Sequence, residues 1–182
     1  MLHKSESSVL VLVDIQQRLL PRIFEGQQVL SQILRLANIA KLVDVPVLGT
    51  EQNPQGLGQN VAQVRQICDS SAGTLEKTHF DACQDGLGPT IAAIGPRRTQ
   101  VVVAGCEAHV CVFQTCAGLL EQGFDVTLVV DAIGSREPAN VKTAIRRARS
   151  LGVTLASVEM IAFEWLRNSD HPRFRDVLAL IR

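Results

Sequence analysis

The chain has 182 residues, with 18 acidic and 18 basic side chains, so its formal net charge is zero. A balanced charge does not attract polyanions, and we therefore expect neither a nucleic-acid partner nor binding to anionic membranes. Apolar runs are far shorter than the roughly 20 residues of a membrane span, and the first eight residues lack the apolar core of a signal peptide. We expect one globular domain, residues 1–182, in the cytoplasm.

Along the chain, short β-branched runs alternate with longer segments of helical periodicity, which predicts βαβ units and a parallel sheet. Strands are expected at Val9–Asp14, Pro46–Thr50, Thr74–Thr78, Gln100–Gly105, Asp125–Asp131 and Thr154–Glu159. Helices are expected at Gln28–Val43, Leu57–Ile67, Leu87–Ile94, Val110–Gln122, Pro138–Ser150, Ile161–Asn168 and Pro172–Ile181. Together these elements predict an α/β fold, a doubly wound sheet of six parallel strands with helices on both faces and the order 3-2-1-4-5-6.

This strand order makes the first and fourth strands neighbours. In doubly wound sheets, ligands bind outside the carboxyl ends of the strands at such a switch point. Asp14 ends the first strand, and Cys111 follows the fourth strand near the start of a helix. Lys77 lies at the carboxyl end of the third strand. The topology therefore predicts that a carboxylate, a thiol and an ammonium group lie at one edge of the sheet.

Cys111 is the candidate nucleophile. A helix start and a nearby ammonium group both favour the thiolate, which is the reactive form of cysteine. Each residue of the set also fits a structural role: Cys111 could be a small buried hydrophobe, Asp14 a capping residue and Lys77 a surface lysine. Only as a set do the three residues predict catalysis.

Disulfides and metal sites find little support in the sequence. An odd number of cysteines without a CxxC pair favours reduced thiols, at positions 68, 83, 106, 111 and 116. The four histidines are scattered and form no ligand motif. We therefore expect neither a bound metal nor another cofactor.

The chain resembles the isochorismatase-like cysteine hydrolase superfamily over nearly its whole length. The segments that carry the resemblance are Val11–Gln16, Glu76–Phe80, Gly105–Val112 and Ser157–Glu164. The resemblance implies that Cys111 is the nucleophile, that Asp14 is the general base and then the acid, and that Lys77 orients Asp14 and supports the thiolate. It also implies a cis peptide bond between Cys106 and Glu107. The N–H groups of Glu107 and Cys111 would then form an oxyanion hole.

Nicotinamidase-like members of that superfamily carry a metal-binding cluster of Asp and His after the second strand. The corresponding stretch here, Gly49–Gly58, contains neither residue type. The resemblance therefore favours the non-nicotinamidase branch, and with it a metal-independent hydrolase that cleaves the C–N bond of a small amide through a thioester. The expected substrate-binding residues are Gln16, Gln52, His79, Phe80, His109 and Phe113.

Two other functions fit the same scaffold. An isochorismate-like enol ether would be hydrolysed by an acid, so this activity would survive loss of the thiol. A non-catalytic protein that binds partners or assembles with itself would keep the fold with an unreactive Cys111. For the amidase we expect a small-molecule substrate and assembly into a homo-oligomer.

Overall fold

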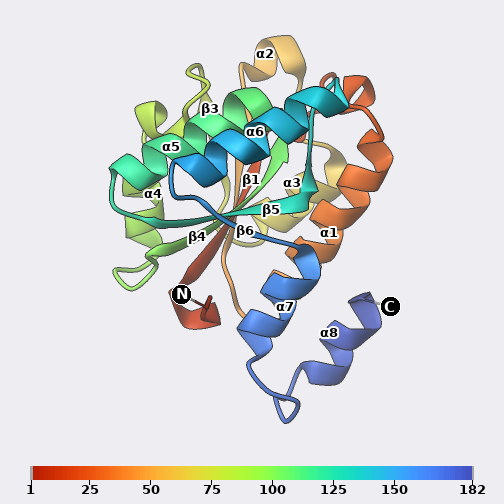
Figure 1. Cartoon of the computed structure of the whole chain (residues 1–182), viewed down its shortest axis with the longest axis vertical. Helices are drawn as coiled ribbons and strands as arrows, with labels where there is room; N and C mark the ends of the chain where they lie inside the picture. Colours follow the sequence, from red (N-terminus) through yellow and green to blue (C-terminus); the bar gives the residue numbers. More distant parts are fainter. Residues whose placement is uncertain (1, 182) are drawn as a thin grey trace.

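The computed structural model describes residues 2–181. Six parallel strands form one sheet in the predicted order, β3-β2-β1-β4-β5-β6 (Figure 1). The strands are β1 (Ser8–Val13), β2 (Val47–Gln52), β3 (Thr74–Lys77), β4 (Gln100–Cys106), β5 (Asp125–Gly134) and β6 (Thr154–Ala156). The strands β1 and β4, both fully buried, pair side by side at the centre of the sheet.

Helices cover both faces of the sheet, as predicted (Figure 1). They are α1 (Gly26–Leu42), α2 (Pro54–Leu57), α3 (Ala62–Asp69), α4 (Leu87–Ile94), α5 (Phe113–Glu121), α6 (Pro138–Ser150), α7 (Val158–Leu166) and α8 (Phe174–Ile181). Single turns of 3-10 helix occur at Ser5–Ser7, Leu20–Arg22 and Ala82–Asp85. In residues 2–181, no helix is both long enough and apolar enough to cross a membrane.

Alternate side chains of β1 enter two separate cores. Leu10 and Leu12 pack with α1, α3, α7 and α8, whereas Val9, Val11 and Val13 pack with α4, α5 and α6. This alternation is the period of two that an extended strand imposes. Because helices cover both faces of the sheet, the whole of β1 is buried. Asp14, which follows β1 at its carboxyl end, is buried as well.

Two sequence-based boundaries are wrong. The helix expected at Leu57–Ile67 is instead two helices, because Gly58 adopts a left-handed φ of 77° that ends α2, and residues 59–61 run beside the segment after β1. The strand expected at Thr154–Glu159 ends at Ala156, because the Ser157 side chain accepts a hydrogen bond from the Met160 N–H and caps α7. That helix therefore begins at Val158, earlier than expected.

The other boundaries differ by three residues or fewer. The helix expected at Val110–Gln122 begins with a π-helical turn, η4 (Ala108–Val112), before α5. Such turns are frequent at functional sites. The strand β5 extends to Gly134, beyond its expected end at Asp131. The helices at Leu87–Ile94 and Pro138–Ser150 are confirmed as predicted.

Gly105 allows β4 to approach β1 where the functional turn begins. Its φ is 131°, and a Cβ at this position would lie 2.1 Å from the carbonyl oxygen of Val13. A larger residue would therefore clash with the β1 backbone and would also be strained. The close approach places the turn after β4 directly beside Asp14, which follows Val13.

Candidate active site

Asp14 is completely buried beyond the end of β1, with a left-handed φ of 52°. Its carboxylate has two partners: Thr50 Oγ1 donates a hydrogen bond to Oδ1 at 2.6 Å, and Lys77 Nζ lies 2.9 Å from Oδ2. The second contact has the distance of an ion pair but not the angles of a hydrogen bond. Thr50 was not among the residues predicted for the site, although its place at the end of the neighbouring strand pointed to this contact.

Lys77 is the expected cation, and its side chain is fully buried. Besides Asp14, its ammonium group donates hydrogen bonds to Gln52 Oε1 at 2.6 Å and to the His79 carbonyl at 3.3 Å. A buried ammonium is tolerated only when its donors are satisfied. Three strand ends, those of β1, β2 and β3, therefore combine to hold one ion pair away from water.

The charges of Asp14 and Lys77 both affect the pKa of the Cys111 thiol. Burial and the Asp14 carboxylate raise the pKa of Cys111 from its ordinary value of 9.0 to about 12, while the Lys77 ammonium lowers it. The expectation that Lys77 favours the thiolate is correct in direction, but burial and Asp14 outweigh it. At neutral pH the group is therefore a thiol, and it can attack only if its proton leaves at the same time.

The turn between β4 and Cys111 has the geometry that the resemblance implied. The peptide bond between Cys106 and Glu107 is cis, as predicted. The Glu107 carbonyl accepts hydrogen bonds from the N–H groups of Val110 and Val112. Within residues 2–181, the N–H of Glu107 itself has no acceptor. It is thus free to act as an oxyanion donor, and that role stays a prediction for Glu107 and Cys111.

The residues predicted to bind substrate fall into two groups. Gln16 and Gln52 are buried, and their amides are engaged with other protein groups. His79 and Phe80 are exposed on the loop after β3, and the His79 ring contacts Asp85. These positions surround Lys77, so the loop after β3 and the end of β2 are the nearest walls of the candidate site.

The other two predicted residues lie on the far side of Cys111. His109 is half-buried, and its Nδ1 lies 3.0 Å from Ser135 Oγ, at the end of β5. Phe113 is buried in the core beneath α6, where the Arg147 guanidinium lies 4.3 Å from the centre of its ring. Substrate contact by either residue stays a prediction, and Phe113 already has packing partners of its own.

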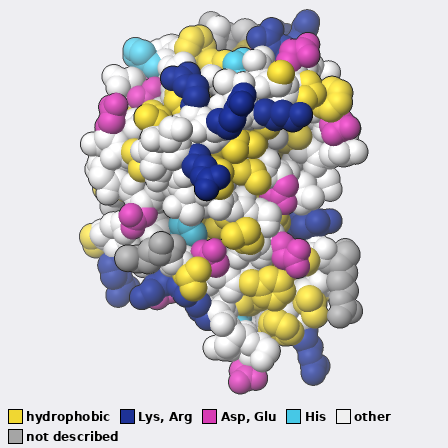
Figure 2. Space-filling view, viewed as in Figure 1, with side chains coloured by type: hydrophobic (Ala, Val, Ile, Leu, Met, Phe, Trp, Pro, Cys, Tyr) yellow, Lys and Arg dark blue, Asp and Glu magenta, His cyan; other side chains and the backbone are white. Residues whose placement is uncertain are grey.

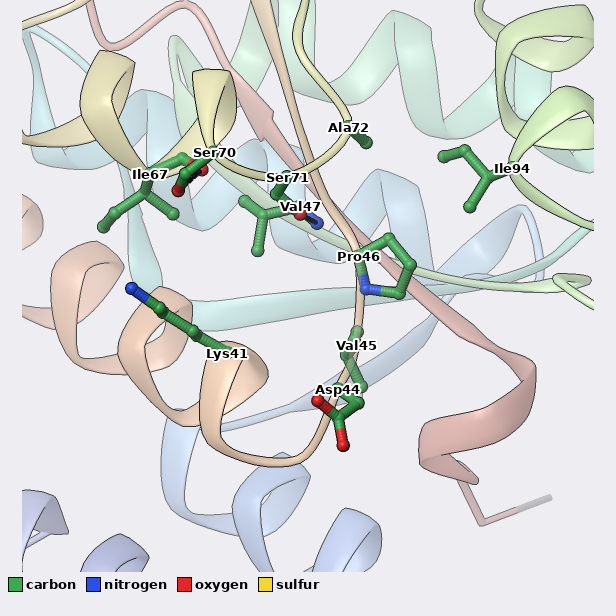
Figure 3. Close-up of a pocket in the computed structure, with 10 residues that line it drawn as sticks. All are labelled: Lys41, Asp44, Val45, Pro46, Val47, Ile67, Ser70, Ser71, Ala72 and Ile94. Carbon is green, nitrogen blue, oxygen red and sulfur yellow. Dashed lines mark hydrogen bonds between the residues drawn. The ribbon is translucent and has the colours of Figure 1, made fainter.

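The largest of the described cavities is remote from these residues. It has a volume of about 460 Å³ and lies at the opposite end of β2, between Lys41, Pro46 and Ile94 (Figure 3). By contrast, Lys77 borders a surface cavity of about 400 Å³ together with Asn53, Thr78 and Asp85. The candidate site therefore lies at the edge of the sheet where β1, β3 and β4 end, away from the cavity at Pro46.

All five cysteines are buried, and burial is the main reason that their pKa values rise from 9.0 to about 12: Cys68, Cys83, Cys106, Cys111 and Cys116. Between pH 9 and pH 12, thiols of the unfolded chain ionise while folded thiols keep their protons. The free energy of unfolding should therefore fall above pH 9, by at most about 1.4 kcal/mol per pH unit for each thiol. Denaturant titrations at pH 8 to 11 measure this slope. Cys68→Ala should make it shallower, and an unchanged slope in that variant would contradict the assignment.

Metal ligands do not cluster in the part of the chain that the structure describes: no group of three His, Cys, Asp or Glu side chains there is arranged to hold an ion. At the end of β2 and in the loop after it, where the resemblance would place the ligands of the nicotinamidase-like branch, the chain has Gln52 and Asn53 instead.

Exhaustive chelation should therefore leave both the melting temperature and the activity unchanged, because a bound zinc ion would contribute several kcal/mol to stability. Elemental analysis of the purified protein, before and after chelation, provides the control. One equivalent of metal that is lost together with activity would contradict this expectation.

Comparisons with known proteins agree with the observed fold. The isochorismatase domain model matches residues 8–160. Isochorismatase domain-containing protein 2 of Rattus norvegicus is 32% identical over 177 residues, which cover 97% of this chain and 82% of the relative. Its Homo sapiens counterpart is 34% identical over 179 residues, covering 97% and 83%.

Solved structures show the same fold. The MAR1 ribonuclease of Caenorhabditis elegans aligns with a TM-score of 0.92 and 31% identity, covering 100% of this chain and 92% of the other. The YcaC gene product of Escherichia coli, an octameric hydrolase of unknown specificity, has a TM-score of 0.85 and 22% identity, covering 100% and 87%. With a family model that spans most of the sequence and relatives that match nearly all of it, the chain belongs to the isochorismatase domain family of hydrolases.

Proposed function

We propose that this hydrolase cleaves the C–N bond of a small amide through a thioester on Cys111, without a metal ion. The carrying observation is the buried pair of Asp14 and Lys77 beside a thiol whose pKa is raised to about 12. Such a thiol needs a base at the moment of attack. Asp14 is the carboxylate whose charge raises the pKa of that thiol.

In the first half of the proposed reaction, Asp14 takes the thiol proton while the sulfur atom of Cys111 attacks the amide carbonyl carbon. The carbonyl oxygen becomes an oxyanion, which the N–H groups of Glu107 and Cys111 would stabilise. Removal of one such donor in other enzymes costs about 3 kcal/mol. Protonated Asp14 then donates its proton to the leaving nitrogen, the C–N bond breaks, and an amine departs from the thioester.

In the second half, Asp14 accepts a proton from a water molecule, whose oxygen attacks the thioester carbonyl. The carbon–sulfur bond breaks, and the proton returns from Asp14 to Cys111 as the carboxylic acid leaves. Lys77 keeps its proton throughout, and its charge holds Asp14 in place. The groups named here return to their starting protonation states, so the cycle needs no cofactor.

The burial of Asp14 and Cys111 limits the size of the substrate that the proposed site can admit. Asp14 is fully buried, and Cys111 is only 6% exposed. A small uncharged amide fits such a site better than a polymer or a dianion, because both would need a wide, cationic opening. Incubation of the purified protein with a panel of small aliphatic and aromatic amides, followed by detection of the released amine, tests the proposal.

Two results with other substrates would replace the proposal. Hydrolysis of an enol ether that persists without the thiol would favour the isochorismate-like reaction. Cleavage of RNA that requires Cys111 would favour the activity in the name of the Caenorhabditis elegans relative. Basic side chains do gather over α6 (Figure 2), at Lys142, Arg146, Arg147 and Arg149, but this surface is not part of the buried site.

We further propose that copies of the chain associate with one another. Apolar side chains gather over α7 and α8 (Figure 2), where Met160 and Phe163 are 52% and 40% exposed. The Phe163 ring also lies 6.5 Å from that of Phe174 on α8. Exposed apolar surface of this kind is typical of protein interfaces. The octameric structure with the same fold supports assembly, whereas the cytoplasmic location of this chain stays a prediction.

A further inference from the structure

Two buried amide side chains, those of Gln16 and Gln52, lie next to the ion pair of Asp14 and Lys77. Gln52 ends β2 and is 9% exposed, and Gln16 follows β1 and is completely buried. The oxygen Oε1 of Gln52 accepts the 2.6 Å hydrogen bond from Lys77 Nζ, on an ammonium that also lies 2.9 Å from Asp14 Oδ2. The ammonium group is thus held between a carboxylate and an amide.

The orientation of the Gln52 amide is itself fixed. Its nitrogen Nε2 donates to the Thr78 carbonyl at 2.7 Å, so its oxygen must face Lys77. Its backbone is also held, because Gln16 Oε1 accepts from the Gln52 N–H at 2.9 Å and Gln16 Nε2 donates to the Gln52 carbonyl at 3.0 Å. Both polar atoms of the Gln52 side chain are therefore engaged within the protein.

We propose that Gln52 is a positioning residue, which holds the Lys77 ammonium against Asp14 and Cys111, and that it does not bind substrate as the sequence suggested. The proposal rests on the function proposed above. A lysine ammonium sits on a flexible four-carbon stem and has three rotatable donors, so its place depends on its acceptors. Without Gln52 Oε1, the remaining neutral acceptors are the His79 and Phe80 carbonyls, at 3.3 and 3.5 Å, on the exposed loop after β3.

The first test replaces Gln52 with methionine, which has a similar length but cannot accept the strong hydrogen bond. The probe is iodoacetamide at pH 9, and mass mapping reports the rate of labelling at Cys111. Because Lys77 lowers the pKa of this thiol, displacement of the ammonium should slow labelling, by about five-fold. Gln63→Met is the matched control, since Gln63 is exposed on α3 and its substitution should leave the rate unchanged.

A double-mutant cycle separates positioning from a general structural effect. In a Lys77→Met background, Gln52→Met should have no further effect on labelling of Cys111, because the ammonium that Gln52 holds is gone. The same five-fold loss in both backgrounds would overturn the proposal. Circular dichroism and melting curves check that each variant is folded.

If Lys77→Met does not fold, Asp14→Asn supplies the second background. Gln52 is then the strongest remaining acceptor for Lys77, so Gln52→Met should slow labelling more than it does in the wild type. An equal loss in the two proteins would again overturn the proposal.

The labelling cycle does not require turnover, so it separates this proposal from the proposed function. Coupled labelling effects in a protein that hydrolyses no amide would support the role of Gln52 and refute the amidase. Amide hydrolysis together with independent, additive labelling effects would support the amidase and refute the role of Gln52.

Discussion

Cys111→Ala is expected to lower amide hydrolysis by about 10⁴-fold or more, because the variant lacks the atom that attacks the carbonyl. The fold should survive. Alanine removes one sulfur atom at a position that is already 6% exposed, so the loss of stability should be about 1 kcal/mol. Initial rates with an amide from the panel, together with thermal melting of both proteins, test the two parts of this prediction.

Cys116→Ala is the matched control. Cys116 lies on α5, in the same hydrophobic core as Cys111, and is completely buried. Its substitution should cost some stability and leave turnover nearly unchanged. If Cys111→Ala melts normally and keeps most of its activity, the thioester is excluded, and an acid-driven reaction centred on Asp14 takes its place.

The convergence of Asp14, Lys77 and Cys111 could be predicted from the sequence because it depends on topology alone. Each residue follows or ends a strand that is recognisable from its apolar pattern, and parallel strands bring their carboxyl ends to one edge of a sheet. No side-chain detail was needed to place the three groups together. The cis peptide after Cys106, by contrast, came from the family resemblance and not from the local pattern.

The roles of Gln16 and Gln52 could not be predicted in this way. A polar side chain at a strand end is equally compatible with binding a ligand and with binding the protein, and the choice depends on register to within one residue. Here the amide of Gln16 pairs with the backbone of Gln52 and so extends the sheet beyond β1. That arrangement also required the break between α2 and α3, which periodicity alone did not reveal.

The net direction of the shift in the Cys111 pKa could not be predicted from the sequence either. The residue types place a helix start and Lys77, which favour the thiolate, near the Asp14 carboxylate, which disfavours it, and the balance depends on how much water remains. Burial and the Asp14 carboxylate both favour the thiol, and together they outweigh Lys77. A raised pKa of Cys111 fits the proposed coupling of attack with proton transfer to Asp14, the general base that the resemblance implied.

Asp14→Asn should therefore have opposite effects on two properties of the same site. Amide hydrolysis should fall by about 10³-fold, because asparagine can neither take the thiol proton nor protonate the leaving amine. Alkylation of Cys111 by iodoacetamide at pH 9 should become faster, because the charge of the Asp14 carboxylate raises the pKa of the thiol. Replacing Asp14 also leaves Lys77 without its carboxylate, which in other buried pairs costs about 3 to 5 kcal/mol.

Turnover, mass-mapped labelling and melting of the same preparations measure all three effects, below the melting temperature of the variant. Asp170→Asn is the control, since Asp170 is exposed and forms no ion pair with the site, and it should behave as the wild type. Slower hydrolysis with equally slow labelling would mean that Asp14 only supports the fold. Retained hydrolysis in a folded Asp14→Asn protein would end the proposed mechanism, because that mechanism assigns each proton transfer to Asp14.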